Sequence, residues 1–157
     1  MTATAVFHST STEATEAFGR RLARGLSVGT VVGLFGDLGA GKTVLARGLA
    51  RGLGVSEPVA SPTFTLVQEY PLPGGRWFYH LDLYRISGSD EALAFGIEEF
   101  LFAPDAIAAM EWAERIPELL IPPGDGSGRD GAGFVSVRIR HAGAGRRMIE
   151  FPADFAE

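Results

Sequence analysis

The chain contains no cysteine, which excludes disulfide bonds, thiol nucleophiles and thiolate metal sites. Its three histidines lie far apart in the sequence and do not have the spacing of zinc ligands. No apolar run approaches the ~20 residues that a membrane-spanning helix needs, and the N-terminus lacks a basic region followed by an apolar one. We therefore expect a cytoplasmic protein that makes no membrane contact.

Basic residues are also outnumbered, with 14 Lys and Arg against 19 Asp and Glu, for a net charge of −5. This balance argues against an extensive surface that binds the phosphate backbone of RNA or DNA. Hydrophobic residues make up 46% and charged residues 21%, as in ordinary globular proteins. At 157 residues the chain is long enough to bury a core, and we expect residues 1–157 to form one domain.

The most informative stretch matches the pattern G-x-x-x-x-G-K-[ST] at every fixed position. It consists of Gly36, Asp37, Leu38, Gly39, Ala40, Gly41, Lys42 and Thr43. Its glycines let the backbone curl around an anion so that successive N–H groups point inward. Lys42 adds a cation that reaches the β- and γ-phosphates, and Thr43 offers a hydroxyl to Mg²⁺. All eight residues are therefore predicted to bind nucleotide, with Lys42 also catalytic and Thr43 a metal ligand.

The surroundings of this phosphate loop support the interpretation. Thr30 to Phe35 is typical of a buried strand, and Val44 to Leu53 is typical of a helix whose N-terminus faces the loop. Such a helix end carries about half a positive charge, which favours a bound phosphate.

Hydrophobic periodicity and turn residues predict the remaining elements. We expect a helix capped by Thr10 with Glu13 in a capping box, one helix from Ser87 or Ser89 to Phe102, and a Gly-rich loop from Pro122 to Gly133. The other expected strands are Thr4–His8, Phe64–Tyr70, Arg76–Tyr84, Ala106–Trp112, Phe134–Arg140 and Arg147–Phe151. Together they predict a three-layer α/β fold of the phosphate-loop NTPase type, with a mixed sheet of about seven strands.

A Mg²⁺ ion in phosphate-loop enzymes needs a second protein ligand, commonly an acidic residue that ends a neighbouring apolar strand. Glu111 follows the apolar run from Ala106 to Met110 and takes this position. It is predicted to hold the ion directly or through water, opposite Thr43. The alternative is a carboxylate that simply ends a strand at the surface.

His80 and Asp82 are two residues apart on one face of a predicted strand, ~6.6 Å along it. Asp82 orients or deprotonates an attacking water, binds a metal-bound water, or forms an ion pair with Arg85; the sequence leaves these readings open. For His80 a hydrogen-bonded packing role is favoured over catalysis, because a lone histidine among aromatic residues is more often structural.

Two further residues have competing interpretations. Trp112 follows Glu111 and packs beside a nucleotide or a partner protein, or belongs to the core. Arg146 at the tip of the last hairpin covers the base of a nucleotide or is a solvated turn residue.

Four segments together resemble the TsaE family, also called YjeE, the ATPase subunit of the bacterial machinery that makes threonylcarbamoyladenosine in tRNA. They are Gly36–Thr43, Ser61–Val67, His80–Arg85 and Glu111–Trp112. The resemblance extends from near Thr12 through the closing hairpin. It implies binding of ATP or ADP with Mg²⁺, Thr43 and Glu111 as metal ligands, and Asp82 and Trp112 near the catalytic centre. It also implies a base pocket drawn from the region of Thr12 and of Arg146.

By the same resemblance, the partners are the threonylcarbamoyl transferase subunit and its inactive paralogue, with tRNA reached only through the complex. Three other functions remain open. A small-molecule kinase shares the size and the phosphate loop, but neither adjacent arginine pair, Arg20-Arg21 or Arg146-Arg147, is typical of a lid. A GTPase is disfavoured because no Asn-Lys-x-Asp motif occurs. A non-hydrolysing scaffold gated by nucleotide is the third.

Overall fold

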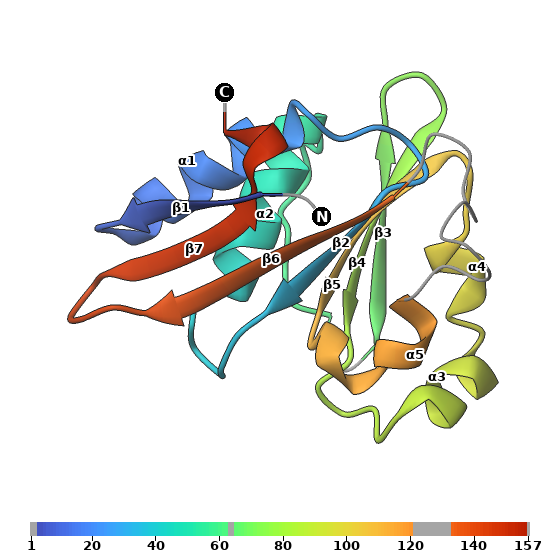
Figure 1. Cartoon of the computed structure of the whole chain (residues 1–157). Coiled ribbons are helices and arrows are strands. Elements are labelled where there is room, and N and C mark those ends of the chain that lie inside the picture. Colours follow the sequence, from blue (N-terminus) through green and yellow to red (C-terminus); the bar gives the residue numbers. More distant parts are fainter. Residues whose placement is uncertain (1–2, 63–64, 121–132, 157) are drawn as a thin grey trace.

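A computed structural model describes residues 3–62, 65–120 and 133–156 of the chain (Figure 1). Its strands form one seven-stranded sheet in the order β1-β7-β6-β2-β5-β4-β3. The strands are β1 (Thr4–Ser9), β2 (Val31–Phe35), β3 (Val67–Leu72), β4 (Arg76–Asp82), β5 (Ala106–Glu111), β6 (Phe134–His141) and β7 (Arg147–Pro152). The helices are α1 (Thr12–Ala23), α2 (Lys42–Leu53), α3 (Ser89–Phe95), α4 (Glu98–Leu101) and α5 (Pro117–Leu120), with 3₁₀ turns η1 (Ala113–Arg115) and η2 (Ala153–Phe155).

The sheet is mixed, as predicted. Strands β6, β2, β5 and β4 run parallel to one another, whereas β3 pairs antiparallel with β4, β7 with β6, and β1 with β7. Strands β2 and β5 are apolar runs because both of their faces are covered, and all six residues of β5 are buried.

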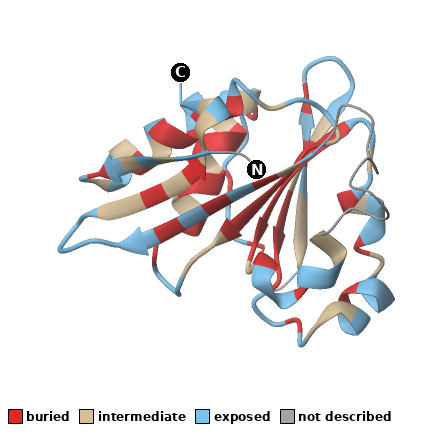
Figure 2. Cartoon of the chain, viewed as in Figure 1, coloured by how far each residue is buried: buried red, intermediate tan, exposed pale blue. Residues whose placement is uncertain are grey.

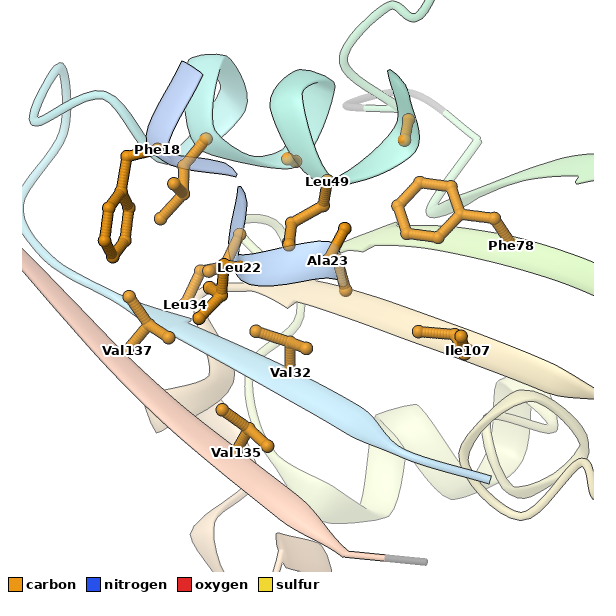
Figure 3. Close-up of a cluster of buried hydrophobic side chains, with 14 of the residues drawn as sticks. Phe18, Leu22, Ala23, Val32, Leu34, Leu49, Phe78, Ile107, Val135 and Val137 are labelled. Atoms are coloured by element: carbon orange, nitrogen blue, oxygen red, sulfur yellow. The ribbon is translucent and has the colours of Figure 1, made fainter. Parts of the chain in front are cut away.

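Helices lie on both faces of the sheet, which gives three layers (Figure 1). On one face α1 and α2 cover a core that includes Phe18, Leu34, Leu49, Ile107 and Val137 (Figure 3). On the other face α3, α4 and η1 cover a second core around Leu81, Met110 and Ile116. Buried residues are concentrated on the central strands, and the outer sides of the helices are exposed (Figure 2). The predicted three-layer α/β architecture with about seven strands is confirmed.

Helices α1 and α2 approach each other closely through glycines. A Cβ atom built on Gly48 would lie 2.2 Å from the backbone oxygen of Glu16, and one built on Gly19 would lie 2.6 Å from the oxygen of Leu45. No side chain fits at such distances, so the crossing depends on residues without a Cβ atom. This packing was not predicted, because nothing in either helix alone indicates its partner.

Several boundaries differ from the sequence prediction, among them the end of β4, which is Asp82 and not Tyr84. Ser11, not Thr10, caps α1, because Ser11 is extended and its hydroxyl accepts a hydrogen bond from the Ala14 amide. The single helix expected up to Phe102 is wrong: Gly96 takes a left-handed conformation at φ 95°, so α3 ends there and α4 follows. Strand β3 begins at Val67 and runs to Leu72. Phe64 and the predicted loop from Pro122, apart from Gly133, lie outside the described residues.

The three central strands end at the same edge of the sheet. Leu34 pairs with Glu111, and Asp82 pairs with Glu111 from the other side. Neighbouring parallel strands point paired residues to the same face, so Asp82 and Glu111 both face the α2 side. The register therefore delivers two carboxylates to the start of α2.

Candidate functional site

The segment Gly36 to Thr43 joins the end of β2 to the start of α2, as the pattern predicts. Helix α2 begins at Lys42, two residues before the predicted start, and its N-cap Gly41 has φ 113° and no side-chain cap. The first N–H groups of a helix have no partner within the helix. The loop therefore presents backbone donors and the positive end of the helix dipole to an anion.

Lys42 is 4% exposed, and its ammonium lies over the ring of Trp112, 3.4 Å from the centroid. It also donates to the backbone oxygen of Gly36. Burial lowers the pKa of Lys42, while the carboxylates of Glu114, Glu111, Asp82 and Asp37 act in the opposite direction. An anion bound beside this ammonium would add to the groups that favour its charged form.

Thr43, Glu111 and His80 form a connected set. The Thr43 hydroxyl donates to both carboxylate oxygens of Glu111, at 3.0 Å and 3.1 Å. His80 Nε2 lies 2.6 Å from Glu111 Oε2. Glu111 is 3% exposed, so the alternative of a surface carboxylate at a strand end is wrong. The structure thus brings together the two predicted metal ligands.

These two ligands suit Mg²⁺ by their chemistry. A hydroxyl and a carboxylate supply hard oxygen donors, and Mg²⁺ is commonly held by one or two carboxylates together with substrate phosphates. Within the described residues no group of three or more His, Cys, Asp or Glu side chains is placed to hold a metal alone. The donor set therefore fits a cation that arrives with a phosphate group.

Asp82 lies beside this set at the end of β4 and is buried. Its Oδ1 accepts a hydrogen bond from the Tyr84 amide at 3.0 Å, and its Oδ2 accepts one from the Ser61 hydroxyl at 3.2 Å. The loop that carries Ser61 therefore contacts the acidic end of the sheet. Ser61 belongs to the segment Ser61–Val67, one of the four that resemble the TsaE family, but its contact with Asp82 was not predicted.

A cavity of about 390 Å³ opens between the phosphate loop and these carboxylates. This volume falls in the range of small-molecule sites. Its lining comprises Leu38, Gly39, Gly41, Lys42, Thr43, Val44, Ser61, Asp82, Tyr84, Glu111 and Trp112. We call it the acidic cavity.

Trp112 takes a left-handed backbone conformation with φ 60°. Residues other than glycine rarely do so, and such strain is retained where the surroundings hold it in place. The indole ring contacts Tyr84, with centroids 5.2 Å apart, as well as the ammonium of Lys42. Trp112 is half-buried and lines the acidic cavity, so its ring forms part of the wall and is not enclosed in the core.

A second cavity of about 370 Å³ lies on the other side of the phosphate loop. Its lining comprises Thr10, Ser11, Thr12, Thr15, Gly39, Gly41, Val44, Gly145 and Arg147. We call it the hydroxyl cavity. The predicted Thr12 lies in it, at the first position of α1.

Arg147, which the sequence analysis did not select, reaches the phosphate loop. Its Nε donates to the Ala40 oxygen at 2.7 Å and its Nη2 to the Gly39 oxygen at 3.5 Å. The predicted Arg146 is exposed and closes the hairpin turn through its backbone, with its amide bonded to Gly143. Period-2 alternation could have indicated Arg147, because it shares the inward face of β7 with Ile149 and Phe151.

Other predicted residues lie as follows. Leu38 is 69% exposed at the rim of the acidic cavity. Asp37 accepts a turn hydrogen bond from the Ala40 amide at 3.1 Å. A Cβ atom on Gly36 would lie 2.4 Å from the backbone oxygen of Ile139, so this position admits only glycine. No helix of the described residues is long and apolar enough to cross a membrane.

Comparison with known proteins agrees with this geometry. Residues 9–148 match the family model of TsaE, threonylcarbamoyl adenosine biosynthesis protein. The tRNA threonylcarbamoyladenosine biosynthesis protein TsaE of Synechocystis is 46% identical over 109 residues, which cover 68% of each chain. The TsaE protein of Bacillus subtilis is 38% identical over 141 residues, covering 90% of this chain and 80% of its own.

Across these and other curated TsaE proteins, the matched region spans between 52% and 80% of the relative's own length. The crystal structure of YdiB from Bacillus subtilis superposes with a TM-score of 0.71 and 29% identity, covering 96% of this chain and 86% of YdiB. The fold is accordingly that of a phosphate-loop NTPase. The chain belongs to the TsaE family of tRNA threonylcarbamoyladenosine biosynthesis proteins.

Proposed function

We propose that this chain is a Mg²⁺-dependent ATPase that binds ATP and ADP and supports turnover of the tRNA threonylcarbamoyladenosine complex. The observation that carries the proposal is the meeting of Lys42, Thr43, Glu111 and Asp82 around the acidic cavity, at the positive end of α2. A phosphate-loop motif that lacked these acidic neighbours would bind an anion without supplying groups for hydrolysis.

Each residue has a proposed role. Amides of Gly36 to Thr43 cradle the phosphates, and Lys42 neutralises charge on the β- and γ-phosphates. Thr43 and Glu111 hold Mg²⁺, which supplies charge neutralisation at the phosphates when bound. Asp82 orients the attacking water. Trp112 borders the reacting end, and the hydroxyl cavity with Thr12 and the region of Arg146 receives the nucleoside.

We propose that the isolated chain hydrolyses ATP slowly. Among the described residues that line the acidic cavity, Lys42 supplies the only basic side chain. Phosphoryl transfer gains about 10³–10⁵-fold from a further cation placed on the transferring group. We propose that the threonylcarbamoyl transferase subunit and its inactive paralogue complete the site, that tRNA is reached only through that complex, and that residues 1–157 act as one cytoplasmic domain.

The test compares hydrolysis by the isolated chain with hydrolysis after addition of the two partners, with and without tRNA. We expect tight ADP and ATP binding, a slow isolated rate and at least about tenfold acceleration by the partners. A fast rate that ignores the partners contradicts the proposal. Binding without hydrolysis under every condition indicates the nucleotide-gated scaffold, and phosphate transfer to a metabolite without hydrolysis indicates the kinase.

A further inference from the structure

His80 is a buried polar residue to which the proposed function gives no role. It lies on β4 facing α2, is 0% exposed, and its ring stacks on Phe78 with centroids 6.5 Å apart. Its neighbour on β5 is Ala109. The small alanine leaves the imidazole room to reach past it toward Glu111, the next residue of β5 on the same face.

The contact between His80 and Glu111 has a defined direction. Nε2 lies 2.6 Å from Oε2 of Glu111, and an ionised carboxylate can only accept, so the ring nitrogen is the donor. Nδ1 is buried and finds no hydrogen-bond partner within the residues that the structure describes. The ring is therefore held in the core by one polar bond, and that bond goes to the carboxylate.

Glu111 needs such a contact if it is to present a fixed oxygen. The terminal torsion of a glutamate is soft and nearly two-fold, so the carboxylate turns easily. Thr43 contacts the two oxygens at almost equal distances, 3.0 Å and 3.1 Å, and so does not distinguish them. His80, by contrast, contacts only one of the two oxygens, Oε2.

We infer that His80 is a positioning residue that fixes the carboxylate plane of Glu111 for a Mg²⁺ ion carried by nucleotide. The inference rests on the proposed function, because it assumes that Glu111 serves the cation. It goes beyond the packing role favoured from sequence: a packing residue affects the stability of the fold, whereas a positioning residue also affects the affinity for the cation. Hydrogen bonds to metal-ligating carboxylates are typically worth about 10–100-fold in metal affinity.

Two amide variants separate these roles. The amide nitrogen of His80→Gln reaches roughly as far as Nε2 and can still donate to Glu111, whereas His80→Asn is equally polar but one methylene too short. Each variant of the full chain is titrated with ADP in the presence of EDTA. In a separate sample without EDTA, Mg²⁺ is titrated into the ADP complex by calorimetry. Thermal unfolding without ligand reports stability separately.

We expect His80→Asn to lose about tenfold or more in Mg²⁺ affinity, with ADP affinity in EDTA within about twofold of wild type, and His80→Gln to keep most of the Mg²⁺ affinity. If His80→Asn does not fold, His80→Leu provides the same comparison with His80→Gln. If the wild-type ADP complex binds Mg²⁺ and every variant binds it equally well, the inference about His80 is wrong while the proposed function stands. A wild type whose ADP complex does not bind Mg²⁺ overturns the metal part of the proposed function and this inference with it.

Discussion

The acidic cavity and the hydroxyl cavity share the phosphate loop as a common wall but are built in different ways. The acidic cavity takes its carboxylates from the ends of β4 and β5, where the parallel register fixes them and both are buried. The hydroxyl cavity takes its polar groups from the start of α1 and from the β6–β7 turn. The carboxylates of the proposed reaction thus come from the parallel part of the sheet, whereas Lys42 comes from α2.

This difference predicts which variants affect turnover and which affect affinity alone. Residues of the acidic cavity contact one another as buried ion and hydrogen-bond partners, so a change there alters charge at the site of the proposed hydrolysis. Residues of the hydroxyl cavity act through hydroxyls, through backbone geometry and through the guanidinium of Arg147, which holds the phosphate loop. Variants on the two sides of the loop should therefore separate turnover from binding.

The largest effect on nucleotide affinity is expected at Lys42, which lines the acidic cavity beside the wall that the two cavities share. Lys42→Ala removes the buried ammonium, and a charged hydrogen bond of this kind contributes about 1.5–3 kcal/mol, so ADP affinity should fall about 10–100-fold. Calorimetric titration measures it. Arg24→Ala removes an equal charge from the exposed end of α1 and should leave affinity unchanged; equal losses in both variants would indicate a general charge effect.

Glu111→Gln should impair the function of the acidic cavity and leave that of the hydroxyl cavity intact. The amide keeps the size of the carboxylate but removes its charge, so we expect turnover to fall about 100-fold with ADP affinity in EDTA nearly unchanged. Steady-state hydrolysis in the assembled complex and titration in EDTA measure the two effects. A loss of EDTA affinity as large as the loss of turnover would show that Glu111 serves binding as a whole.

Asp82→Asn should affect turnover only. If Asp82 orients the attacking water, its loss costs about 10²-fold or more in rate while affinity remains. The measurement is single-turnover hydrolysis of ATP in the assembled complex. The matched control is Asp105→Asn, which changes a carboxylate at the opposite end of β5 and should leave the rate intact. Normal hydrolysis by Asp82→Asn would remove its catalytic role and favour the structural ion pair with Arg85.

The smallest effect is expected on the hydroxyl-cavity side, at Arg147. Its guanidinium holds the oxygens of Ala40 and Gly39, and because a peptide is planar this fixes the direction of the amides opposite them. Arg147→Met should weaken ADP binding about fivefold to tenfold, equally with and without Mg²⁺. The adjacent Arg146→Met is the control, with no effect expected. A loss confined to Arg146→Met would restore the sequence prediction for the hairpin tip.

Most of the acidic cavity could be predicted from the sequence. The glycine spacing around Lys42 has few other uses, and Glu111 follows an apolar run. Asp82 was predicted inside a strand that continues to Tyr84, and only the structure shows that β4 ends at Asp82, paired with Glu111. The hydroxyl cavity could be predicted only in outline. The expected start of the last strand at Arg147 agrees with β7, but a strand pattern does not show which distant segment its first side chain will reach.

The contacts that only the structure revealed join segments distant in sequence. The glycine crossing of α1 and α2, the bond from Ser61 to Asp82 and the bond from His80 to Glu111 each depend on two elements arriving together. No local pattern contains this information, since a helix or strand records its own buried face but not the residue that will cover it.

The sequence by itself determined the phosphate loop, the strand and helix around it, the parallel core and the family, because backbone conformation and hydrophobic periodicity are local properties of the chain. The tertiary structure decided which oxygen of Glu111 is held, which arginine reaches the loop and how the two cavities divide the site. Those outcomes depend on strand register and on the close approach of α1 to α2, which are settled when the elements pack.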